Sequence, residues 1–387
     1  MMKRLIAEYN EVLKMQKDLK RFGFGFMRLP YKKDNPSVID FDEVNKMVDR
    51  YIESGGNYFD TGYSYLGGKS ETSLRECVIK RYPRDRILIA DKMPVYEMSK
   101  DDDPYEIFQT QLERCGVDYF DYYLVHDPEN KYYEGICKDL DIFNILNEFK
   151  LEGKIRKLGM SLHDTPEVLD KILTEHPEIE FVQLQINYDD WNSIRVQARA
   201  NYEICLKHEK PVFIMEPIQG GKLANVNENV MKVFNQYDER SPAQWALSFV
   251  FNLDNVDMIL SGMHSLKDVE ENTRFVKEFN KLNVEEMHII NKARDIMQNN
   301  TGIDCRYCNY CKEKCTQKIP ISTYFQLYNQ NKQSLKIDEN TFKVYDNLVN
   351  EHPKASDCVK CGKCEEVCPQ HIKIRKELEK IALLFEY

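Results

Sequence analysis

The sequence predicts an α/β protein in which a (β/α)8 TIM barrel precedes a small α-rich domain. Two observations predict this division of the 387 residues. Up to about residue 300, short apolar segments alternate with longer segments of helical period, as in parallel strands joined by crossover helices. Beyond that point lie eight of the 12 cysteines, all between Cys305 and Cys368. A cut near residue 300 therefore separates two domains of different composition.

Eight short apolar segments are predicted to be strands, because each is followed by a longer amphipathic segment. Eight strand–helix units in about 260 residues match a closed barrel, whereas a doubly wound sheet usually has fewer strands. The predicted strands are residues 23–27, 57–61, 87–92, 119–126, 157–162, 181–187, 211–217 and 256–262.

The predicted helices follow these strands at roughly 41–54, 70–81, 104–115, 139–151, 166–175, 194–209, 242–252 and 267–279. A further helix should end near Asn299 or Gly302, because both residue types tolerate the left-handed conformation at a helix C-terminus. Residues 1–20, which carry charges throughout, are predicted to form an N-terminal helical extension. The predicted domains are thus 1–20, 21–300 and 301–387.

Composition narrows the class of protein. With 42% hydrophobic residues, 16 Gly and 14 Pro, the chain is predicted to be globular. A formal net charge of −10 disfavours a nucleic-acid partner. No apolar run approaches the ~20 residues that span a bilayer, and the first ten residues lack the apolar core of a signal peptide. We therefore expect a cytoplasmic protein without a membrane partner, in which clustered cysteines bind metal rather than form disulfides.

Two cysteine runs, at residues 305–315 and 358–369, share the spacing C-x2-C-x2-C-x3-C. Three thiolates of such a loop bind three irons of a cubane cluster, while the fourth usually reaches the other cluster in two-cluster ferredoxins. Zinc is the alternative, but tetrahedral zinc sites pair two C-x2-C hooks and leave the remaining cysteines without a role. The runs therefore predict a ferredoxin-like domain with two 4Fe-4S clusters. The expected ligand sets are Cys305, Cys308, Cys311 with Cys368, and Cys358, Cys361, Cys364 with Cys315.

Two features depart from the pattern of a minimal ferredoxin. Thr316 stands where proline usually follows the fourth cysteine. The two runs are separated by roughly forty residues, more than a minimal ferredoxin needs. We expect an inserted helical segment between them, with residues 337–348 as its helix.

Ionisable residues end three successive predicted strands: Asp60, Lys92 and His126. Chemistry in a barrel of this class occurs at these strand ends, and Tyr65 follows Asp60 by five residues. A carbonyl that accepts a hydride needs a proton, which an ordinary phenol with a pKa of about 10 gives up reluctantly at neutral pH. We expect Lys92, held by an ion pair with Asp60, to lower the pKa of Tyr65. His126 would donate a hydrogen bond to the substrate oxygen.

The order of several motifs resembles the aldo-keto reductase superfamily over about residues 21–280. The matching pieces are G-F-G-F-M-R-L-P, F-D-T-G-Y-S-Y-L-G-G-K-S-E, I-A-D-K, L-V-H-D, R-K-L-G-M-S, Q-L-Q-I-N-Y, E-P-I-Q-G-G-K-L and S-G-M-H-S-L-K-D-V-E-E-N. The resemblance implies a catalytic tetrad of Asp60, Tyr65, Lys92 and His126. Together with the cysteine runs, the chain resembles the reductases of anaerobes that carry a C-terminal ferredoxin-like domain.

The same resemblance implies a nucleotide site. It places Ser161, Gln183 and Asn187 near the nicotinamide carboxamide, Gly220, Gly221 and Leu223 near the pyrophosphate, and Ser261, Gly262, Glu271 and Asn272 near the adenosine. Three positions depart from the family pattern: Leu162 replaces an asparagine, Met215 replaces the aromatic residue that stacks on the nicotinamide, and Asp268 replaces an arginine that binds the 2′-phosphate. Lys267, His264 or Arg274 would be the compensating basic residues. We expect NADH to serve at least as well as NADPH.

The leading interpretation is an oxidoreductase that reduces a carbonyl or oxidises an alcohol with NAD(P)H, while two clusters exchange electrons with a ferredoxin or another carrier. Hydride moves two electrons and each cluster accepts one, so joining the two reactions ordinarily requires a flavin or a radical-tolerant substrate. Three alternatives stay open: the clusters are structural, the barrel is a docking scaffold of an electron-transfer protein, or the barrel holds a flavin.

Overall fold

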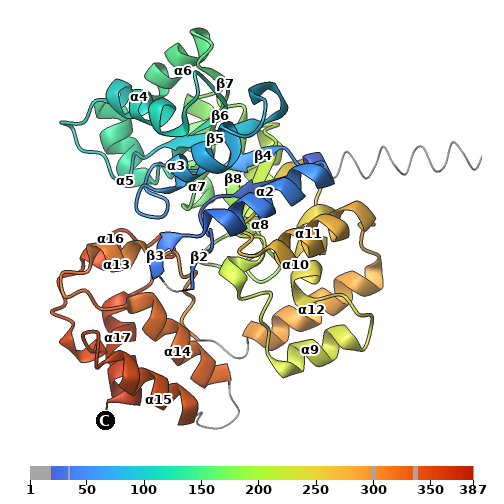
Figure 1. Cartoon of the computed structure of the whole chain (residues 1–387), viewed down its shortest axis with the longest axis vertical. Coiled ribbons are helices and arrows are strands. Elements are labelled where there is room, and N and C mark those ends of the chain that lie inside the picture. The colour runs from blue at the N-terminus through green and yellow to red at the C-terminus, as the bar shows by residue number, and fades with distance from the viewer. Residues whose placement is uncertain (1–18, 34, 299–301, 334–338, 387) are drawn as a thin grey trace, which may run out of the picture. The chain divides into compact units, whose positions relative to one another are not determined.

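The computed structural model describes residues 19–33, 35–298, 302–333 and 339–386 (Figure 1). The chain divides into two compact units. The barrel unit comprises Met1–Pro217 and Ala246–Asn283, and the cysteine unit comprises Ile218–Trp245 and Val284–Tyr387. The helix predicted for residues 1–20 falls outside the described residues except for Leu19 and Lys20. The boundaries 1–20, 21–300 and 301–387 stay predictions.

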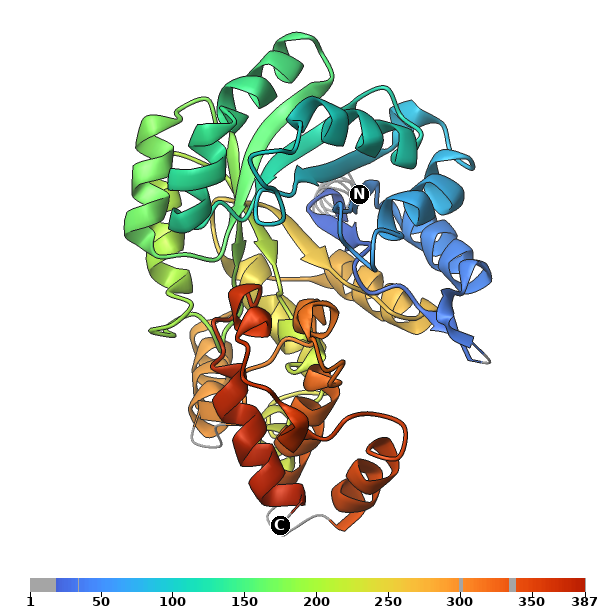
Figure 2. The same cartoon turned by 90° about the vertical axis from the view of Figure 1, so that its left-hand side faces the viewer.

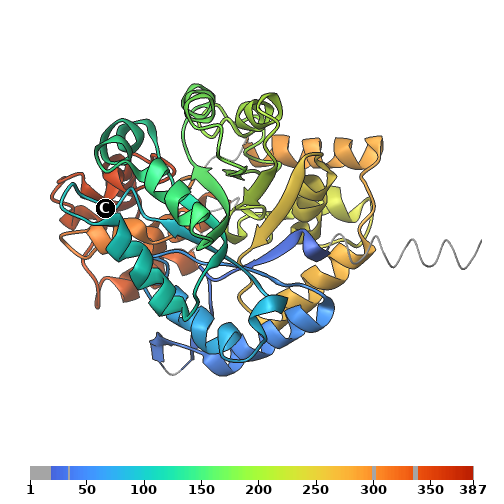
Figure 3. The ribbon, with the colours of Figure 1, turned by 90° about the horizontal axis from the view of Figure 1, so that it is seen from above.

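Eight parallel strands close into a barrel in the order β1-β10-β9-β8-β7-β6-β5-β4, which confirms the predicted fold class. Helices of the barrel unit surround these strands (Figure 3). The strands are β1 Phe22–Gly25, β4 Tyr58–Asp60, β5 Leu88–Met93, β6 Phe120–His126, β7 Ile155–Leu162, β8 Phe181–Gln185, β9 Val212–Met215 and β10 Val256–Ser261.

The connecting helices are α2 Phe41–Ser54, α3 Ser70–Leu74, α4 Pro104–Cys115, α6 Ile142–Leu151, α7 Pro166–Glu175, α8 Ala198–Lys207, α10 Pro242–Asn252 and α11 Leu266–Glu278. Four of them, α2, α4, α7 and α10, have the predicted bounds. Helix α2 shows why: the Asp40 side chain accepts a hydrogen bond from the Glu43 amide, and Gly55 ends the helix at φ 109°.

Several short elements were not predicted, because they span too few residues to show a period. They are the antiparallel strands β2 Tyr31–Lys32 and β3 Asn35–Ile39, the single turn η2 Arg84–Arg86, and the segment α5 Asn130–Tyr132 with η3 Tyr133–Cys137. Helix η1 Arg75–Ile79 is a π-helical continuation of α3, and the two together lie within the helix predicted at 70–81.

Apolar side chains from six barrel strands pack into one cluster, in which the Phe181 and Phe213 rings lie 4.3 Å apart. Gly159 on β7 provides the space for Phe181, since a Cβ atom there would lie 2.5 Å from the ring. The cluster contains Tyr58, Ala90, Leu124, Phe181, Phe213, Met258 and Leu260.

A buried acidic pair lies where β5 meets α3 and α4. Glu71 and Asp91 are fully buried, and Glu71 Oε2 pairs with Arg114 Nη1 at 3.0 Å. Successive residues of a strand point to opposite faces, so Asp91 faces these helices while Lys92 faces the barrel interior. Burial raises the pKa of both carboxyl groups, that of Asp91 well above its ordinary value, and the Glu71 charge raises the pKa of Asp91 further. Asp91 is therefore the carboxyl group of this pair that holds a proton more readily than an ordinary aspartate does.

The cysteine unit is mainly helical, and its helices from residue 302 onward form one group (Figure 2). A shared apolar core includes Ile319, Tyr324, Tyr345 and Ile381 together with several cysteines. Its elements are η4 Gln219–Gly221, α9 Glu228–Asn235, α12 Val284–Gln298, α13 Tyr310–Lys314, α14 Ile321–Gln333, α15 Glu339–Leu348, η5 Ala355–Asp357, α16 Lys363–Glu366 and α17 Ile374–Phe385. The predicted inserted helix at 337–348 corresponds to α15, whereas α14 and α17 were not predicted.

No helix within the described ranges combines the length and the apolar character that crossing a bilayer requires.

The acidic pair generates a prediction for stability. The pKa of Asp91 in the folded chain lies above its unfolded value near 4, so the bound proton stabilises the fold fully below pH ~4. This contribution is lost as the pH rises through the raised pKa. Asn at position 91 is always neutral. The free energy of unfolding of Asp91→Asn should therefore decrease less between pH 5 and pH 8 than that of the unmodified chain. Urea unfolding at both pH values measures this, with the exposed Asp85→Asn as the control. An unchanged pH slope in Asp91→Asn would contradict the assignment.

Candidate functional site

The four residues of the predicted tetrad come from adjacent parts of the barrel unit. Asp60 is the last residue of β4, Lys92 is the fifth residue of β5, and His126 ends β6. These strands are neighbours in the barrel, and Tyr65 lies in the loop between β4 and α3. The side chains of all four residues are buried.

Lys92 and Asp60 form a buried ion pair, with Lys92 Nζ 2.7 Å from Asp60 Oδ1. The same ammonium donates a second hydrogen bond, of 2.6 Å, to the Thr61 carbonyl oxygen. Burial raises the pKa of Asp60, while Lys92 opposes this shift. These two acceptors hold the Lys92 ammonium in place. They also offset the cost of burying its charge away from water.

The Tyr65 ring lies beside this ammonium, with Lys92 Nζ 4.9 Å from the ring centroid. The loop holds Tyr65 through its own backbone, since the amides of Gly68 and Ser70 both donate to the Tyr65 carbonyl. Burial raises the pKa of the Tyr65 phenol well above its ordinary value, and nearby acidic groups, Asp60 first, raise it further. The expectation that Lys92 lowers this pKa is therefore wrong for the resting structure. The Asp60 carboxylate offsets the Lys92 charge, and the buried phenol has lost its hydration.

His126 packs edge-on against two tyrosines. Its ring centroid is 5.7 Å from that of Tyr65 and 4.9 Å from that of Tyr96. Burial lowers the pKa of His126 well below its ordinary value, and the positive charges of Lys92 and His163 lower it further. The imidazole is therefore neutral at physiological pH and donates from one ring nitrogen.

Sequence reasoning missed Tyr96 as a neighbour of this site. Its hydroxyl lies 2.8 Å from the Ser64 hydroxyl, next to Tyr65 in the chain. Its position four residues after Lys92, just past the end of β5, was the available signal, because such loops surround barrel active sites.

Three residues predicted near the nicotinamide lie on successive strands of the barrel. Ser161 is on β7, opposite Gln183 of β8 in the register, and Met215 ends β9. Gln183 Nε2 lies 3.5 Å from Met215 Sδ, while Gln183 Oε1 is buried without a partner among the described atoms. The structure thus places Ser161, Gln183 and Met215 together, and the Gln183 side-chain oxygen is available to accept a hydrogen bond.

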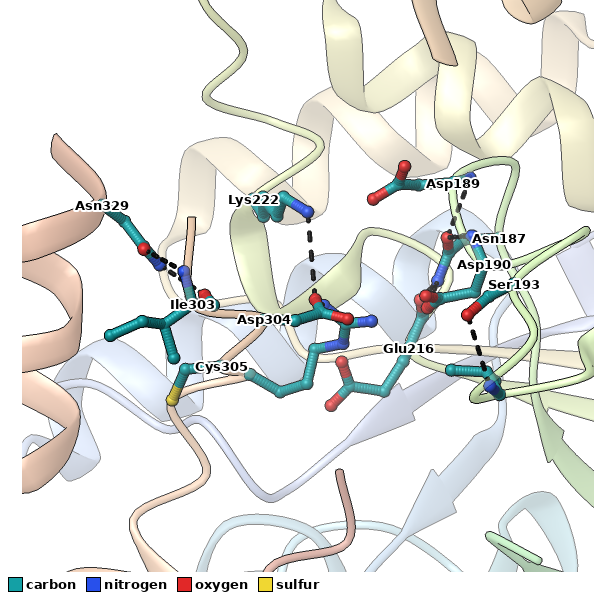
Figure 4. A network of polar contacts seen from close by, with 12 residues as sticks. Asn187, Asp189, Asp190, Ser193, Glu216, Lys222, Ile303, Asp304, Cys305 and Asn329 are labelled. Carbon is teal, nitrogen blue, oxygen red and sulfur yellow. Dashed lines mark hydrogen bonds and ion pairs between the residues drawn. The ribbon is translucent and has the colours of Figure 1, made fainter. Parts of the chain in front are cut away.

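Asn187 follows β8, and its side-chain amide is occupied by neighbouring groups of the chain (Figure 4). Its Oδ1 accepts from the amides of Asp189 and Asp190, and its Nδ2 donates to Asp190 Oδ2 and to the Glu216 carbonyl. This network gives Asn187 a structural role in the turn after β8.

The residues predicted near the adenosine lie at the end of β10 and in α11. Ser261 ends β10 and is buried, Gly262 follows it, Glu271 is on α11 within 3.7 Å of Lys267, and the buried Asn272 is one residue further along. Asp268 is the third residue of the helix, where its carboxylate accepts from the amides of His264 and Ser265, both at 3.0 Å. Sequence reasoning missed this capping box, although Ser265 followed by an acid three residues later is its signal.

The predicted pyrophosphate loop belongs to the cysteine unit. Gly220 and Gly221 both have positive φ, 65° and 98°, and the Leu223 side chain is buried. The intervening Lys222 reaches Asp304, the residue before Cys305, with 3.9 Å between Nζ and Oδ1 (Figure 4).

The two cysteine runs interleave in the cysteine unit. Burial raises the pKa of the Cys305 thiol to about 12, and among the neighbouring charges that raise it are those of Cys308 and Cys368. Burial likewise raises the pKa of Cys364 to about 12, with Cys358 and Cys315 among its neighbours. The fourth cysteine of each run therefore lies among the thiols of the other run.

A direct contact also joins the runs. The Thr316 hydroxyl, next to Cys315 in the chain, lies 3.7 Å from Cys361 Sγ. Across the described residues, no three His, Cys, Asp or Glu side chains converge closely enough to bind one metal ion together. The donor set consists of eight thiols arranged crosswise, and this chemistry fits two cubane clusters.

Comparison with known proteins gives the family. Residues 21–295 match the aldo/keto reductase family, and residues 304–372 match the 4Fe-4S dicluster domain, which implies two clusters. The NADH-specific methylglyoxal reductase of Escherichia coli (strain K12) is 23% identical over 273 residues, which cover 58% of this chain and 81% of the relative. An aldo-keto reductase of Mycobacterium avium (strain 104) is 25% identical over 219 residues, covering 56% of this chain and 70% of the relative.

Solved structures agree on the fold. An aldo-keto reductase from Klebsiella pneumoniae in complex with NADPH superposes with a TM-score of 0.55 at 19% identity, covering 70% of this chain and 90% of the other. The holo form of an aldo-keto reductase from Bacillus halodurans gives 0.54 at 22% identity, covering 70% and 91%. The chain therefore belongs to the aldo-keto reductase family of oxidoreductases and joins that barrel to a 4Fe-4S dicluster domain.

Proposed function

We propose that the barrel reduces a small carbonyl compound to an alcohol with NAD(P)H, and that two 4Fe-4S clusters in the cysteine unit exchange single electrons with a carrier protein. The observation that carries the proposal for the barrel is the buried Lys92–Asp60 pair, 2.7 Å long, with the Tyr65 ring beside the ammonium and the His126 ring beside Tyr65.

The protonation states of these residues support carbonyl reduction. When bound, NAD(P)H supplies a hydride to the carbonyl carbon. Tyr65 is protonated at rest and gives its proton to the oxygen as negative charge develops there. The Lys92 ammonium then stabilises the phenolate that remains, and the neutral His126 donates a hydrogen bond to the same oxygen.

The proposed nucleotide site rests on two groups of residues. Ser161, Gln183 and Met215 are neighbours at the strand ends of the barrel unit, where a nicotinamide would lie beside the tetrad. Ser261, Gly262, Asp268, Glu271 and Asn272 are proposed for the adenosine end. Among the similar proteins, the Escherichia coli relative is specific for NADH, and the Klebsiella pneumoniae structure contains NADPH.

The clusters are proposed to be held by the eight cysteines in the crosswise sets Cys305, Cys308, Cys311, Cys368 and Cys358, Cys361, Cys364, Cys315. A hydride carries two electrons and each cluster one, so a link between the two reactions needs a flavin or a radical-tolerant substrate. We therefore assign the hydride reaction to the barrel and one-electron exchange to the cysteine unit.

One observation favours a second candidate, a flavin in place of the nicotinamide. The position of the expected stacking aromatic holds Met215, and the predicted carboxamide partner Gln183 lies against its sulfur. The absorbance spectrum of anaerobically purified protein separates the two candidates, because flavin gives a structured band and clusters a broad one.

Tyr65→Phe should lower kcat for carbonyl reduction by about 10²–10⁴-fold while leaving NAD(P)H binding nearly unchanged, because only the proton donor is removed. The matched control is Tyr63→Phe, two residues away, whose ring packs under the Arg114 guanidinium at 4.6 Å. Steady-state assays and nucleotide titrations measure both effects. A loss of less than tenfold in Tyr65→Phe would show that another group supplies the proton.

Anaerobic reconstitution should give eight irons and eight acid-labile sulfides per chain, as two complete ligand sets imply. Cys315→Ser should damage the cluster bound by Cys358, Cys361 and Cys364, and spare the one bound by its sequence neighbours. Iron analysis and electron paramagnetic resonance of Cys315→Ser and Cys368→Ser distinguish the two clusters, with the buried Cys205→Ser of the barrel unit as control. Near-stoichiometric zinc without iron would exclude the clusters.

NADH should bind at least as tightly as NADPH, because the Asp268 carboxylate repels the 2′-phosphate. Asp268→Asn removes the charge and keeps an oxygen that accepts from the His264 and Ser265 amides, so it isolates the electrostatic effect. We expect NADPH affinity to rise about fivefold or more in Asp268→Asn, with NADH affinity unchanged. Titrations with both nucleotides measure this, and Asp268→Arg should improve NADPH binding further. NADPH binding more than tenfold tighter than NADH in the unmodified chain would show that a basic group such as Lys267 holds the phosphate.

A further inference from the structure

The eight cysteines, all within the described residues, differ in their contact with solvent. Cys361 is the exposed one. Cys305 and Cys311 of the other proposed ligand set are buried, and Cys308 and Cys368 are half-buried. An electron crosses protein more slowly as distance grows, so the cluster that Cys361 helps to hold is the better placed of the two to exchange electrons with another molecule.

The two cysteine runs are rich in positive charge, whereas the chain as a whole is negatively charged. The segments 305–318 and 354–376 contain ten Lys and Arg against four Asp and Glu, while the chain as a whole has a net charge of −10. The cysteine runs therefore form a basic region on an acidic protein.

Part of this basic charge is already neutralised within the cysteine unit. Lys360 pairs with Glu379 at 2.6 Å, and Arg375 pairs with Glu365 at 2.8 Å. Exposed Glu313 and Glu366 add negative charge to the same segments. Several other lysines of these segments form no ion pair within the described residues, and their positive charge remains.

Three such lysines lie on the two short helices that flank Cys361. Lys312 and Lys314 are on α13, Lys363 is on α16 two residues after Cys361, and these helices pack against each other (Figure 1). All three side chains are exposed. Val359, two residues before Cys361, is 59% exposed and adds an apolar contact. An exposed thiol beside an apolar residue, with exposed lysines on the two helices packed around it, has the form of a docking surface for electron exchange.

We propose that this surface, comprising Lys312, Lys314, Val359, Cys361 and Lys363, docks a small acidic one-electron carrier protein. The inference rests on the proposed function of the two clusters. One electron passes between the reduced carrier and the oxidised cluster, or in reverse, with no bond made or broken. The lysines raise the local concentration of the acidic partner and orient it, and Val359 excludes water from the contact.

Paired charge reversals test the surface. The variant Lys314→Glu/Lys363→Glu reverses the proposed surface, and Lys292→Glu/Lys343→Glu makes the same change in charge on α12 and α15, where both lysines are exposed. Each protein is reduced with dithionite and then oxidised in a stopped-flow instrument by an acidic flavodoxin, by anionic ferricyanide and by cationic hexaamminecobalt(III). Oxidation is followed by cluster absorbance at about 10 mM ionic strength, where screening is weak, and at high salt.

We expect Lys314→Glu/Lys363→Glu to be oxidised about tenfold more slowly by flavodoxin and ferricyanide, and faster by hexaamminecobalt(III), with both differences lost at high salt. A mere shift in cluster potential would change all three rates in one direction, and the potential measured by redox titration reports it separately. Isothermal titration calorimetry with flavodoxin should show weaker binding to this variant than to Lys292→Glu/Lys343→Glu.

Equal rates in the two charge-reversed proteins, or rates that change in one direction with all three oxidants, would overturn the inference. Iron content and carbonyl reduction are measured on the same preparations. Failure of the proposed function appears there, as missing iron or absent reductase activity, whereas failure of the docking surface leaves both intact.

Discussion

The arrangement of the candidate active site depends on one buried ion pair, Lys92 with Asp60. The two residues lie on neighbouring strands. The Lys92 ammonium donates short hydrogen bonds to the Asp60 carboxylate and to the Thr61 carbonyl oxygen, in a buried site. Removing either partner would leave a buried charge unpaired, at a cost of about 3–5 kcal/mol. The pair also sets the electrostatics of Tyr65, because the phenol meets an ammonium whose charge is already offset. The resting site therefore contains a protonated tyrosine and a neutral histidine, both hydrogen-bond donors.

The barrel could be predicted almost completely from the sequence, because its strands are short apolar segments and its helices carry local stop signals. Asp40 and Gly55 bracket α2, and Asp103 and Gly116 bracket α4, at the predicted residues. The spacing of the cysteines also predicted the 4Fe-4S dicluster domain that the family comparison shows. The short strands β2 and β3 could not be predicted, because two and five residues show no clear period. The π-helical geometry of η1 could not be predicted either, although the helix itself was.

Side-chain environments were the part of the candidate site that the sequence could not supply. The motif placed Lys92 near Tyr65, but the sign of the pKa shift depends on how much water each group loses, which only packing determines. Asp268 shows the same limit. Its position in the motif suggested a role at the nucleotide, but only the structure shows that its carboxylate also accepts hydrogen bonds from two backbone amides at the start of α11. Tyr96 lies beside His126 through a loop whose course no periodicity records.

The assignment of Ile218–Trp245 to the cysteine unit has a consequence for how the molecule opens. Within that unit Lys222 reaches Asp304, and Arg240 joins Glu286 of α12 while its guanidinium lies 3.8 Å above the Trp245 ring. Segments that share buried contacts tend to lose their structure as one cooperative group. The glycine loop at Gly220 and Gly221 is therefore expected to share its amide hydrogen-exchange protection with the helices around the cysteines. A fluctuation that loosens the thiols would then loosen this loop as well, although some eighty residues of chain lie between Gly221 and Cys305.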